Sequence, residues 1–309
     1  MKRKVVKHGD STLTISLPSK WVMANNIKQG QHLNVESSKG ILIISNEEKH
    51  FDSITTDLSK DEEWAIRKIL RHLYVSGYDE ININFSNPQQ LSQIRKGLDV
   101  LTGMEVMESK PNYCKLRCMI SIDESEYEIT AKRMLNLVLT QLEYFLEDCK
   151  KGNSVMWGEV LEIFFTFSKL CNLSRRLINK KNIFDIIQSK YAYDFLNGLM
   201  EISLFIKYSY GQINKKGKVK LTEKELEFIS KTVEFFSGLI SAYNTLSKEK
   251  IKDFFIQREK MFDNVLEILN DKNPIITHYF LMILRNMTSI GNHILMQNLD
   301  IENKGKNKK

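Results

Sequence analysis

KRKVVKHGDSTLTISLPSKW, from Lys2 to Trp21, opens the chain, and IKQGQHLNVE (27–36) and GILIIS (40–45) follow it. Apolar and polar side chains alternate over residues 3–7 and 12–17, which predicts two half-buried strands. Gly9-Asp10 separates the two runs and can supply a turn. Pro18 can start a short helix over residues 19–25, because its fixed φ suits the first turn.

A hairpin is predicted next, with strands at 33–36 and 41–44 and Lys39-Gly40 at its tip. Gly30 suits the turn before this hairpin. Elements this short cannot build much of a core within about 45 residues, whereas two copies that interleave strands can. The segment is therefore predicted to form a homodimer.

The positive charge of the chain is concentrated in this segment. Residues 1–45 carry seven Lys and Arg against two acids, a net charge of +5, and the tail 301–309 carries four Lys against one Glu, a net charge of +3. Since the whole chain is +7, residues 46–300 sum to −1. A local excess of this kind is typical of a surface that meets phosphates. The basic tail is typical of a disordered, solubilising end.

DNA is therefore the predicted partner of the N-terminal segment, and we expect Arg3, Lys4, Lys7 and Lys20 to contact it. Lysine serves phosphates as a point charge, whereas arginine can bind a guanine edge through two hydrogen bonds, so Arg3 is the candidate for sequence readout. The alternative for the same charges is a dimerisation platform whose lysines are merely solvated.

Composition limits the other classes of function. With 42% apolar residues, the 309-residue chain can bury substantial cores in two or three domains. It has four cysteines, too few and too irregularly spaced for a disulfide framework, which suits a reducing compartment: Cys114, Cys118, Cys149 and Cys171. Cys114 and Cys118 are interpreted as buried thiols. The N-terminus shows no apolar signal region and no run of 18 apolar residues occurs, so we expect a cytoplasmic protein without membrane insertion.

No catalytic motif is visible. The sequence contains no P-loop, no GxSxG and no GxGxxG after a strand, so we expect neither an enzyme nor a cofactor. The six histidines lack metal-ligand spacing, and His278 and His293 are interpreted as helix-face residues. Aromatic and Met side chains at helical spacing are interpreted as core: Phe164, Phe167, Phe235, Phe236 and Met282.

The rest of the chain is predicted to be mainly helical. A polar stretch, residues 46–58, is interpreted as a linker, and residues 61–122 alternate helical and strand patterns in a small α/β module. Long amphipathic runs follow and predict helices at about 125–151, 154–180, 183–213, 222–246, 249–270 and 274–298. Two sets of three helices of similar length suggest two related three-helix bundles.

Two family resemblances follow from these patterns. The first 45 residues resemble the SpoVT/AbrB swapped-hairpin DNA-binding domain, which is also found in MazE-type antitoxins. The whole chain resembles archaeal PhoU-like phosphate uptake regulators that begin with such a domain. This second resemblance is carried by LYVSGYDEINI (73–83), LTGMEVME (101–108), ITAKRMLNLVLTQLEYFLEDCKKGN (129–153) and RNMTSIGNHI (285–294).

The resemblance implies a multi-domain, mainly α protein. Its parts are a SpoVT/AbrB-like swapped-hairpin domain (1–46), a linker with the α/β module (47–122), two PhoU-like bundles (123–214 and 218–300) and a basic tail (301–309). It also implies a transcriptional regulator of phosphate uptake, with phosphate-signalling proteins as further partners.

Metal binding, which the resemblance implies for PhoU bundles, is not expected here. PhoU helices carry acidic pairs four residues apart, whereas Phe164, Phe165 and Ser168 stand at the corresponding places of this chain. One pair keeps the spacing, Glu259 and Asp263, and an isolated pair is more often a solvated helix face than a metal site.

Three functional classes remain open. The first is the DNA-binding regulator with a sensing or interacting helical body. The second is a PhoU-type adaptor that restrains a phosphate transporter or sensor kinase and uses its N-terminal domain only to dimerise. The third, a MazE-like antitoxin, is weaker, because about 250 ordered-looking residues follow the N-terminal segment where an antitoxin has a short tail.

Overall fold

The computed structural model describes residues 1–38, 41–46, 51–121, 123, 125–181, 183–216, 220–263 and 268–306. The chain divides into two compact units, Met1–Phe51 and Asp52–Lys309. The predicted hairpin tip, Lys39-Gly40, lies outside the described residues, as do the last three residues of the basic tail.

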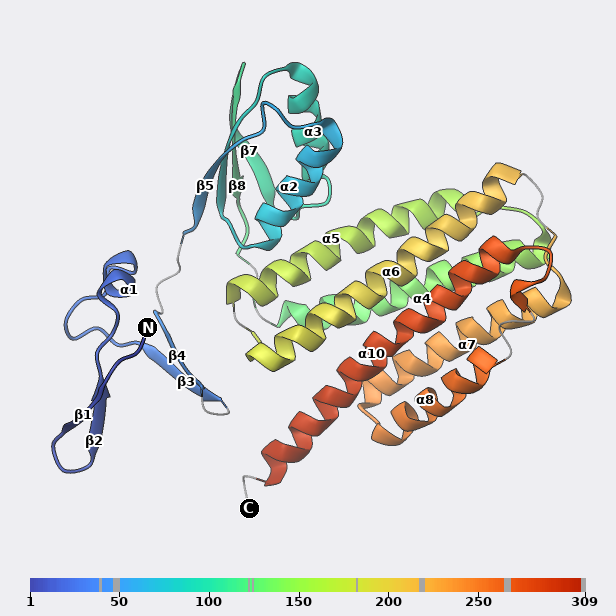
Figure 1. The fold of residues 1–309 in the computed structure, drawn as a ribbon. Coiled ribbons are helices and arrows are strands. Elements are labelled where there is room, and N and C mark those ends of the chain that lie inside the picture. The colour runs from blue at the N-terminus through green and yellow to red at the C-terminus, as the bar shows by residue number, and fades with distance from the viewer. Residues whose placement is uncertain are drawn as a thin grey trace. The chain divides into compact units, whose positions relative to one another are not determined.

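The first unit consists of two antiparallel ribbons and one short helix (Figure 1). Strands β1 (Val5–His8) and β2 (Thr12–Ile15) pair across a turn at Gly9, whose φ of +73° is a conformation that glycine adopts without strain. Helix α1 (Ser19–Ala24) follows Pro18, and β3 (Asn34–Ser38) pairs with β4 (Ile41–Ser45). The predicted order of elements in this segment is confirmed.

Residues 52–121 form the predicted α/β module. Its sheet has the order β5-β6-β8-β7, from β5 (Ser53–Asp57), β6 (Glu80–Asn84), β7 (Met104–Lys110) and β8 (Tyr113–Cys118). Strands β5 and β6 run parallel around helix α2 (Glu63–Val75), and α3 (Pro88–Leu98) joins β6 to β7. Both helices lie on one side of the sheet (Figure 1), and their buried Ile66, Leu70 and Ile94 share a core with Ile81 and Leu116.

The predicted linker at 46–58 is wrong where it includes β5. Residues 53–57 read SITTD and pair with all five residues of β6. Only Ile54 marks the segment as apolar, so its composition reads as polar loop. Thr and Ser are nevertheless tolerated in an edge strand with one solvated face, and pairing with the buried β6 decides the structure.

The remainder is helical, as predicted. The helices are α4 (Glu126–Lys151), α5 (Trp157–Lys181), α6 (Ile186–Lys216), α7 (Glu223–Thr245), α8 (Lys248–Asp263) and α10 (Pro274–Lys306). Local signals set several ends: Gly152 ends α4 with a φ of +67°, and Thr222 with Glu225 forms a capping box at the start of α7.

The last helix is longer than expected. The pattern predicts its end near residue 298, yet α10 continues to Lys306 and so includes most of the basic tail. No Gly or Pro occurs between Ile294 and Gly305, so the backbone meets no strong helix breaker there. Composition alone made these residues look disordered.

The helices share one core. Helices α4, α5 and α6 pack on one another, as do α7, α8 and α10, and the two sets meet where α6 contacts α10 and α4 contacts α7. A single apolar cluster extends through both sets, from Met134 and Phe145 to Phe236 and Phe280. Phe167 and Phe236 are buried as predicted, whereas Phe164 lies outside this core and is only partly covered.

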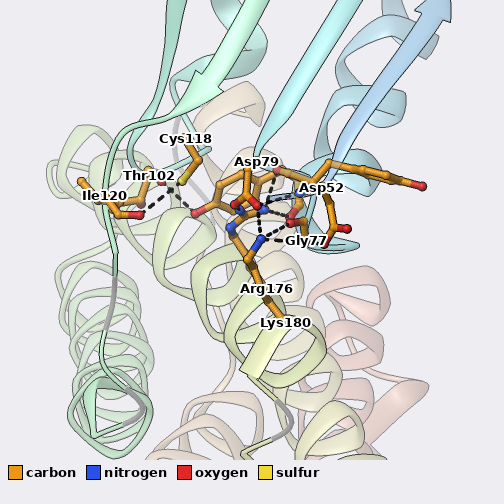
Figure 2. Close-up of polar contacts among 10 residues, drawn as sticks. Asp52, Gly77, Asp79, Thr102, Cys118, Ile120, Arg176 and Lys180 are labelled. Carbon is orange, nitrogen blue, oxygen red and sulfur yellow. Dashed lines mark hydrogen bonds and ion pairs between the residues drawn. The ribbon is translucent and has the colours of Figure 1, made fainter. Parts of the chain in front are cut away.

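The α/β module is attached to helix α5 by a polar junction (Figure 2). The Arg176 guanidinium donates hydrogen bonds to the carbonyls of Tyr74 (2.8 Å) and Tyr78 (2.9 Å) and pairs with Asp79 Oδ1 at 2.8 Å. The Lys180 ammonium also pairs with Asp79 and donates to the carbonyl of Gly77. These cations lie at the C-terminal end of α2, where they satisfy free carbonyls and complement the helix dipole.

The same junction holds the start of the second unit. The Asp52 amide donates to Asp79 Oδ2 (3.1 Å), and the Asp79 amide donates to the Asp52 carbonyl (2.8 Å). These bonds hold Asp52, the first residue of the second unit, against the segment between α2 and β6. The sequence hinted at this only through Arg176 and Lys180, which are four residues apart and so share a helix face.

Candidate nucleic-acid interface

The β1–β2 ribbon presents two faces of different chemistry. Val5 lies opposite Ile15 and Lys7 lies opposite Leu13, so these two pairs share one face. The other face carries the pairs Val6–Thr14 and His8–Thr12. The Thr14 hydroxyl donates to the Val6 carbonyl at 3.1 Å, which ties the two strands together on that side. The ribbon is thus mostly apolar on one face and mixed on the other.

The apolar side chains of this unit are largely exposed among its described residues. Among residues 1–35 and 41–46 no residue is buried, and Leu13 and Val5 are 70% and 60% exposed. Among the described residues of the unit, eight more apolar side chains are exposed by about half or more: Met1, Val6, Ile15, Met23, Val35, Ile41, Leu42 and Phe51. An exposed apolar face such as the one that carries Val5, Leu13 and Ile15 is typical of a surface that binds a partner.

Three of the four predicted DNA contacts lie along the first strand of the ribbon and the residues just before it. Arg3 and Lys4 precede β1 and Lys7 lies within it, whereas Lys20 belongs to α1. Lys4, Lys7 and Lys20 are exposed, and none of them pairs with a carboxylate within the described residues. Ammonium groups that are free in this way can meet phosphates without first breaking an ion pair.

Arg3 differs from the three lysines. It is half-covered, and its Nε is shielded from solvent without a hydrogen-bond partner in the described structure. A guanidinium held partly against the protein is less free to reach a base edge than an exposed one. The base-reading role predicted for Arg3 therefore requires its side chain to move, whereas the phosphate role predicted for the lysines does not.

A small hydrogen-bond network braces the region between α1 and β4. The Gln31 amide donates to Asn46 Oδ1 at 2.8 Å, and the Asn46 amide donates to the Asn25 carbonyl at 3.3 Å. Asn25 in turn donates from its side chain to the Trp21 carbonyl at 2.8 Å, which fixes the end of α1. This network holds the helix that carries Lys20 to the end of the second ribbon. Sequence analysis did not single out these three polar residues.

The residual metal candidate is an exposed pair on α8. Glu259 is solvent-exposed and pairs with Arg258 at 2.6 Å, and Asp263 is exposed at the end of the helix. Within the ranges that the structure describes, no three His, Cys, Asp or Glu side chains gather as a metal site would require. The structure therefore brings no further ligand to Glu259 and Asp263.

One comparison with known proteins gives a match. Residues 6–49 match the MazE family model, described as antidote-toxin recognition MazE, bacterial antitoxin. The chain carries an N-terminal domain of the MazE/SpoVT-AbrB type. Comparison with curated proteins and with solved structures gives no match. The match ends at residue 49, so the PhoU resemblance of the remaining residues stays a prediction.

The described helices differ from membrane-spanning segments in length or apolar character. Within the described ranges, none of them combines the length and the apolar character that a transmembrane span requires. The longest helices, α6 and α10, carry their apolar residues toward the shared core instead.

Proposed function

We propose that the chain is a homodimeric, DNA-binding transcriptional regulator whose N-terminal domain binds DNA and whose helical body senses a state or a partner. The observation that carries the proposal is the MazE/AbrB-type domain at residues 6–49, since domains of this type suggest DNA binding and typically dimerise. The charge distribution supports it, because the segment is strongly basic and residues 46–300 are close to neutral.

Dimerisation is supported by the exposed apolar face of the ribbon. Burying a Val or Leu side chain contributes about 1.5–3 kcal/mol relative to leaving it in water. Val5, Leu13 and Ile15 lie together on one face and remain exposed in the single chain. A second copy that interleaves its ribbons with the first covers such faces on both partners at once, which is the swapped-hairpin arrangement.

In the proposed complex, the lysines contact phosphates and set affinity rather than sequence. Lys4, Lys7 and Lys20 have no carboxylate partner in the part of the chain that the structure describes, so binding should depend strongly on salt and only moderately on sequence. Arg3 would add sequence preference if its side chain swings out to a guanine.

A role in phosphate uptake is the finer part of the proposal. It rests on the resemblance of residues 73–83, 101–108, 129–153 and 285–294 to PhoU-like regulators. The division of the helices into two related bundles rests on the similar lengths of the two sets of three helices. Under this proposal, the protein acts in the cytoplasm and its helical body contacts phosphate-signalling proteins.

The adaptor is the second candidate. The same exposed apolar faces would serve a protein that dimerises through residues 1–46 and binds only proteins. In that case the lysines of the ribbon are merely solvated.

A DNA-binding measurement on variants separates the two candidates. Lys4→Ala with Lys7→Ala removes four cations from a dimer and should lower affinity for all duplex sequences by at least about tenfold at low salt. The matched control, Lys190→Ala with Lys252→Ala, removes two exposed lysines of the helical body and should leave affinity unchanged. Fluorescence anisotropy on several labelled duplexes provides the readout, and Arg3→Ala should additionally reduce the differences between duplexes. Full binding by the Lys4/Lys7 variant would favour the adaptor.

A further inference from the structure

Five side chains from three helices form an aromatic surface on the helical body. Phe164 and Phe165 lie on α5, Lys207 and Tyr208 on α6, and Tyr279 on α10. Their rings are linked in series: Phe164 to Phe165 with centroids 6.1 Å apart, and Tyr208 to Tyr279 at 5.8 Å. The Lys207 ammonium joins the two parts, at 4.1 Å from the Phe164 centroid and 5.5 Å from that of Tyr208.

The aromatic surface is open to solvent. Phe165 is 50% exposed and Tyr208 is 43% exposed, while Phe164 and Tyr279 are partly covered. Aromatic rings bury large areas when they are covered, and exposed groups of them are enriched where another molecule binds. Helices α5 and α6 contribute other side chains to the core, such as Phe167 and Ile206, which are fully buried. The exposed rings of Phe165 and Tyr208 are therefore not part of the core.

Lys207 has no counter-ion among the residues that the structure describes. Among the described residues no carboxylate pairs with it, and no hydrogen bond from its ammonium is formed. The neighbours that a helix would offer it are Ser203, Leu204, Tyr210 and Gly211, none of them acidic. Burial of the side chain lowers its pKa below the usual value of a lysine, with no charged neighbour opposing the change.

Other lysines of the helical body are arranged differently. Lys231 pairs with Glu227 at 2.6 Å and Lys151 with Glu147 at 3.3 Å, each through an acid four residues earlier on the same helix. Lys207 instead lies over two rings, where a half-desolvated ammonium gains from cation–π contact but keeps its charge uncompensated. The position therefore favours an incoming carboxylate.

We propose that the aromatic surface is a docking site for an acidic segment of a protein partner. In the proposed complex, a carboxylate of the segment pairs with Lys207 while a neighbouring aromatic or aliphatic side chain packs on Phe165 and Tyr208. Charge complementarity favours an acidic protein segment, because one uncompensated cation within an apolar surface fits a single carboxylate flanked by apolar groups. A nucleic acid strand fits less well, since it requires a series of cations along its backbone. The inference does not depend on DNA binding by residues 1–46.

Peptide binding tests the proposal on the full-length chain. The probes are an array of short fluorescein-labelled peptides that combine Asp or Glu with Phe or Leu in varied order, with Gln-for-Glu and Ser-for-Phe versions as controls. Anisotropy should detect binding of acidic peptides with apolar residues and not of either control. Lys207→Met, which removes the charge and keeps an unbranched side chain of similar length, should weaken that binding by at least about tenfold.

Two variants complete the design. Phe165→Ser with Tyr208→Ser should also abolish binding, whereas Lys190→Met, an exposed lysine of the same helix, should leave it unchanged. Unaltered circular dichroism melting shows that each variant is folded. Absence of binding by every peptide, or equal binding by the Lys207→Met chain, would overturn the proposal. So would concentration-dependent self-association, or binding of a single-stranded oligonucleotide, that is lost in these variants, because the occupant would then be a second copy or a nucleic acid.

Discussion

His293 is a buried, titratable residue in the core of the helical body. Its imidazole on α10 packs against the ring of Phe195 on α6, 4.7 Å away, and lies 6.5 Å from that of Tyr243 on α7. Neither ring nitrogen has a hydrogen-bond partner in the described structure. Burial lowers the pKa of His293 from 6.5 to about 4, because an apolar environment disfavours the charged imidazolium.

The pH dependence of stability should reveal this residue. The folded-state pKa lies below the unfolded one, so the unfolded chain binds the extra proton and stability falls as pH decreases from about 6.5 toward 4. The shift corresponds to an order of magnitude of about 3 kcal/mol in total. His293→Phe keeps an aromatic ring without titrating, so it should lose clearly less stability between pH 7 and 4.5. Urea unfolding at several pH values measures this, and identical losses in both chains would contradict it.

A substitution of Arg176 tests how much the junction between the α/β module and α5 contributes to stability. Its side chain is only 7% exposed, and Arg176→Ala would remove one of the two cations that pair with Asp79 and free the carbonyls of Tyr74 and Tyr78. Breaking a buried pair in this way costs about 3–5 kcal/mol. Lys231→Ala is the control, because its exposed pair with Glu227 should contribute less than about 1 kcal/mol. Denaturant unfolding distinguishes the two, and equal small losses would show that the junction is not important for stability.

For single residues, the sequence predicted which side chains belong to periodic apolar patterns. It did not predict contacts between residues that are far apart in the chain. His278 and His293 both looked like helix-face residues, and only His278 is exposed. The partner that buries His293 is Phe195, nearly a hundred residues away, and no local pattern reports such a contact. The junction of Arg176 with Asp79 was missed for the same reason.

At the scale of elements, long amphipathic helices were predicted to within a few residues at most ends. Their periodic apolar residues and caps are local signals, as at Gly152 and Thr222. Strand β5 was missed because its five residues are mostly polar and become a strand only by pairing with β6. The length of α10 was underestimated because a basic composition was read as disorder.

The two ribbons of the N-terminal unit lead to a prediction about dimerisation. A fragment of residues 1–46 should be a dimer, since its exposed Val5, Leu13 and Ile15 cannot form a core within one copy. Sedimentation equilibrium of the fragment measures its mass in solution. A folded monomer would contradict the swapped-hairpin arrangement and leave the exposed face to a different partner.

At the scale of the whole molecule, the sequence predicted the order of parts: a small β unit, an α/β module and a helical body. The N-terminal part could also be placed in a family, because residues 6–49 match a known domain type. The function of the helical body could not be derived in the same way. Its apolar periodicity reports packing, and packing alone does not identify what a surface binds.

The central claim is that residues 1–46 bind DNA as a dimer through their cations. Fluorescence anisotropy of the full chain on duplex DNA across a salt series tests it most directly. If about six to eight charges of the dimer contact phosphates, the logarithm of affinity should fall with the logarithm of salt concentration at a slope of about −5 to −7. A chain that lacks residues 1–46 should not bind. Absence of binding by the full chain at low salt, or undiminished binding by the truncated chain, would contradict the account.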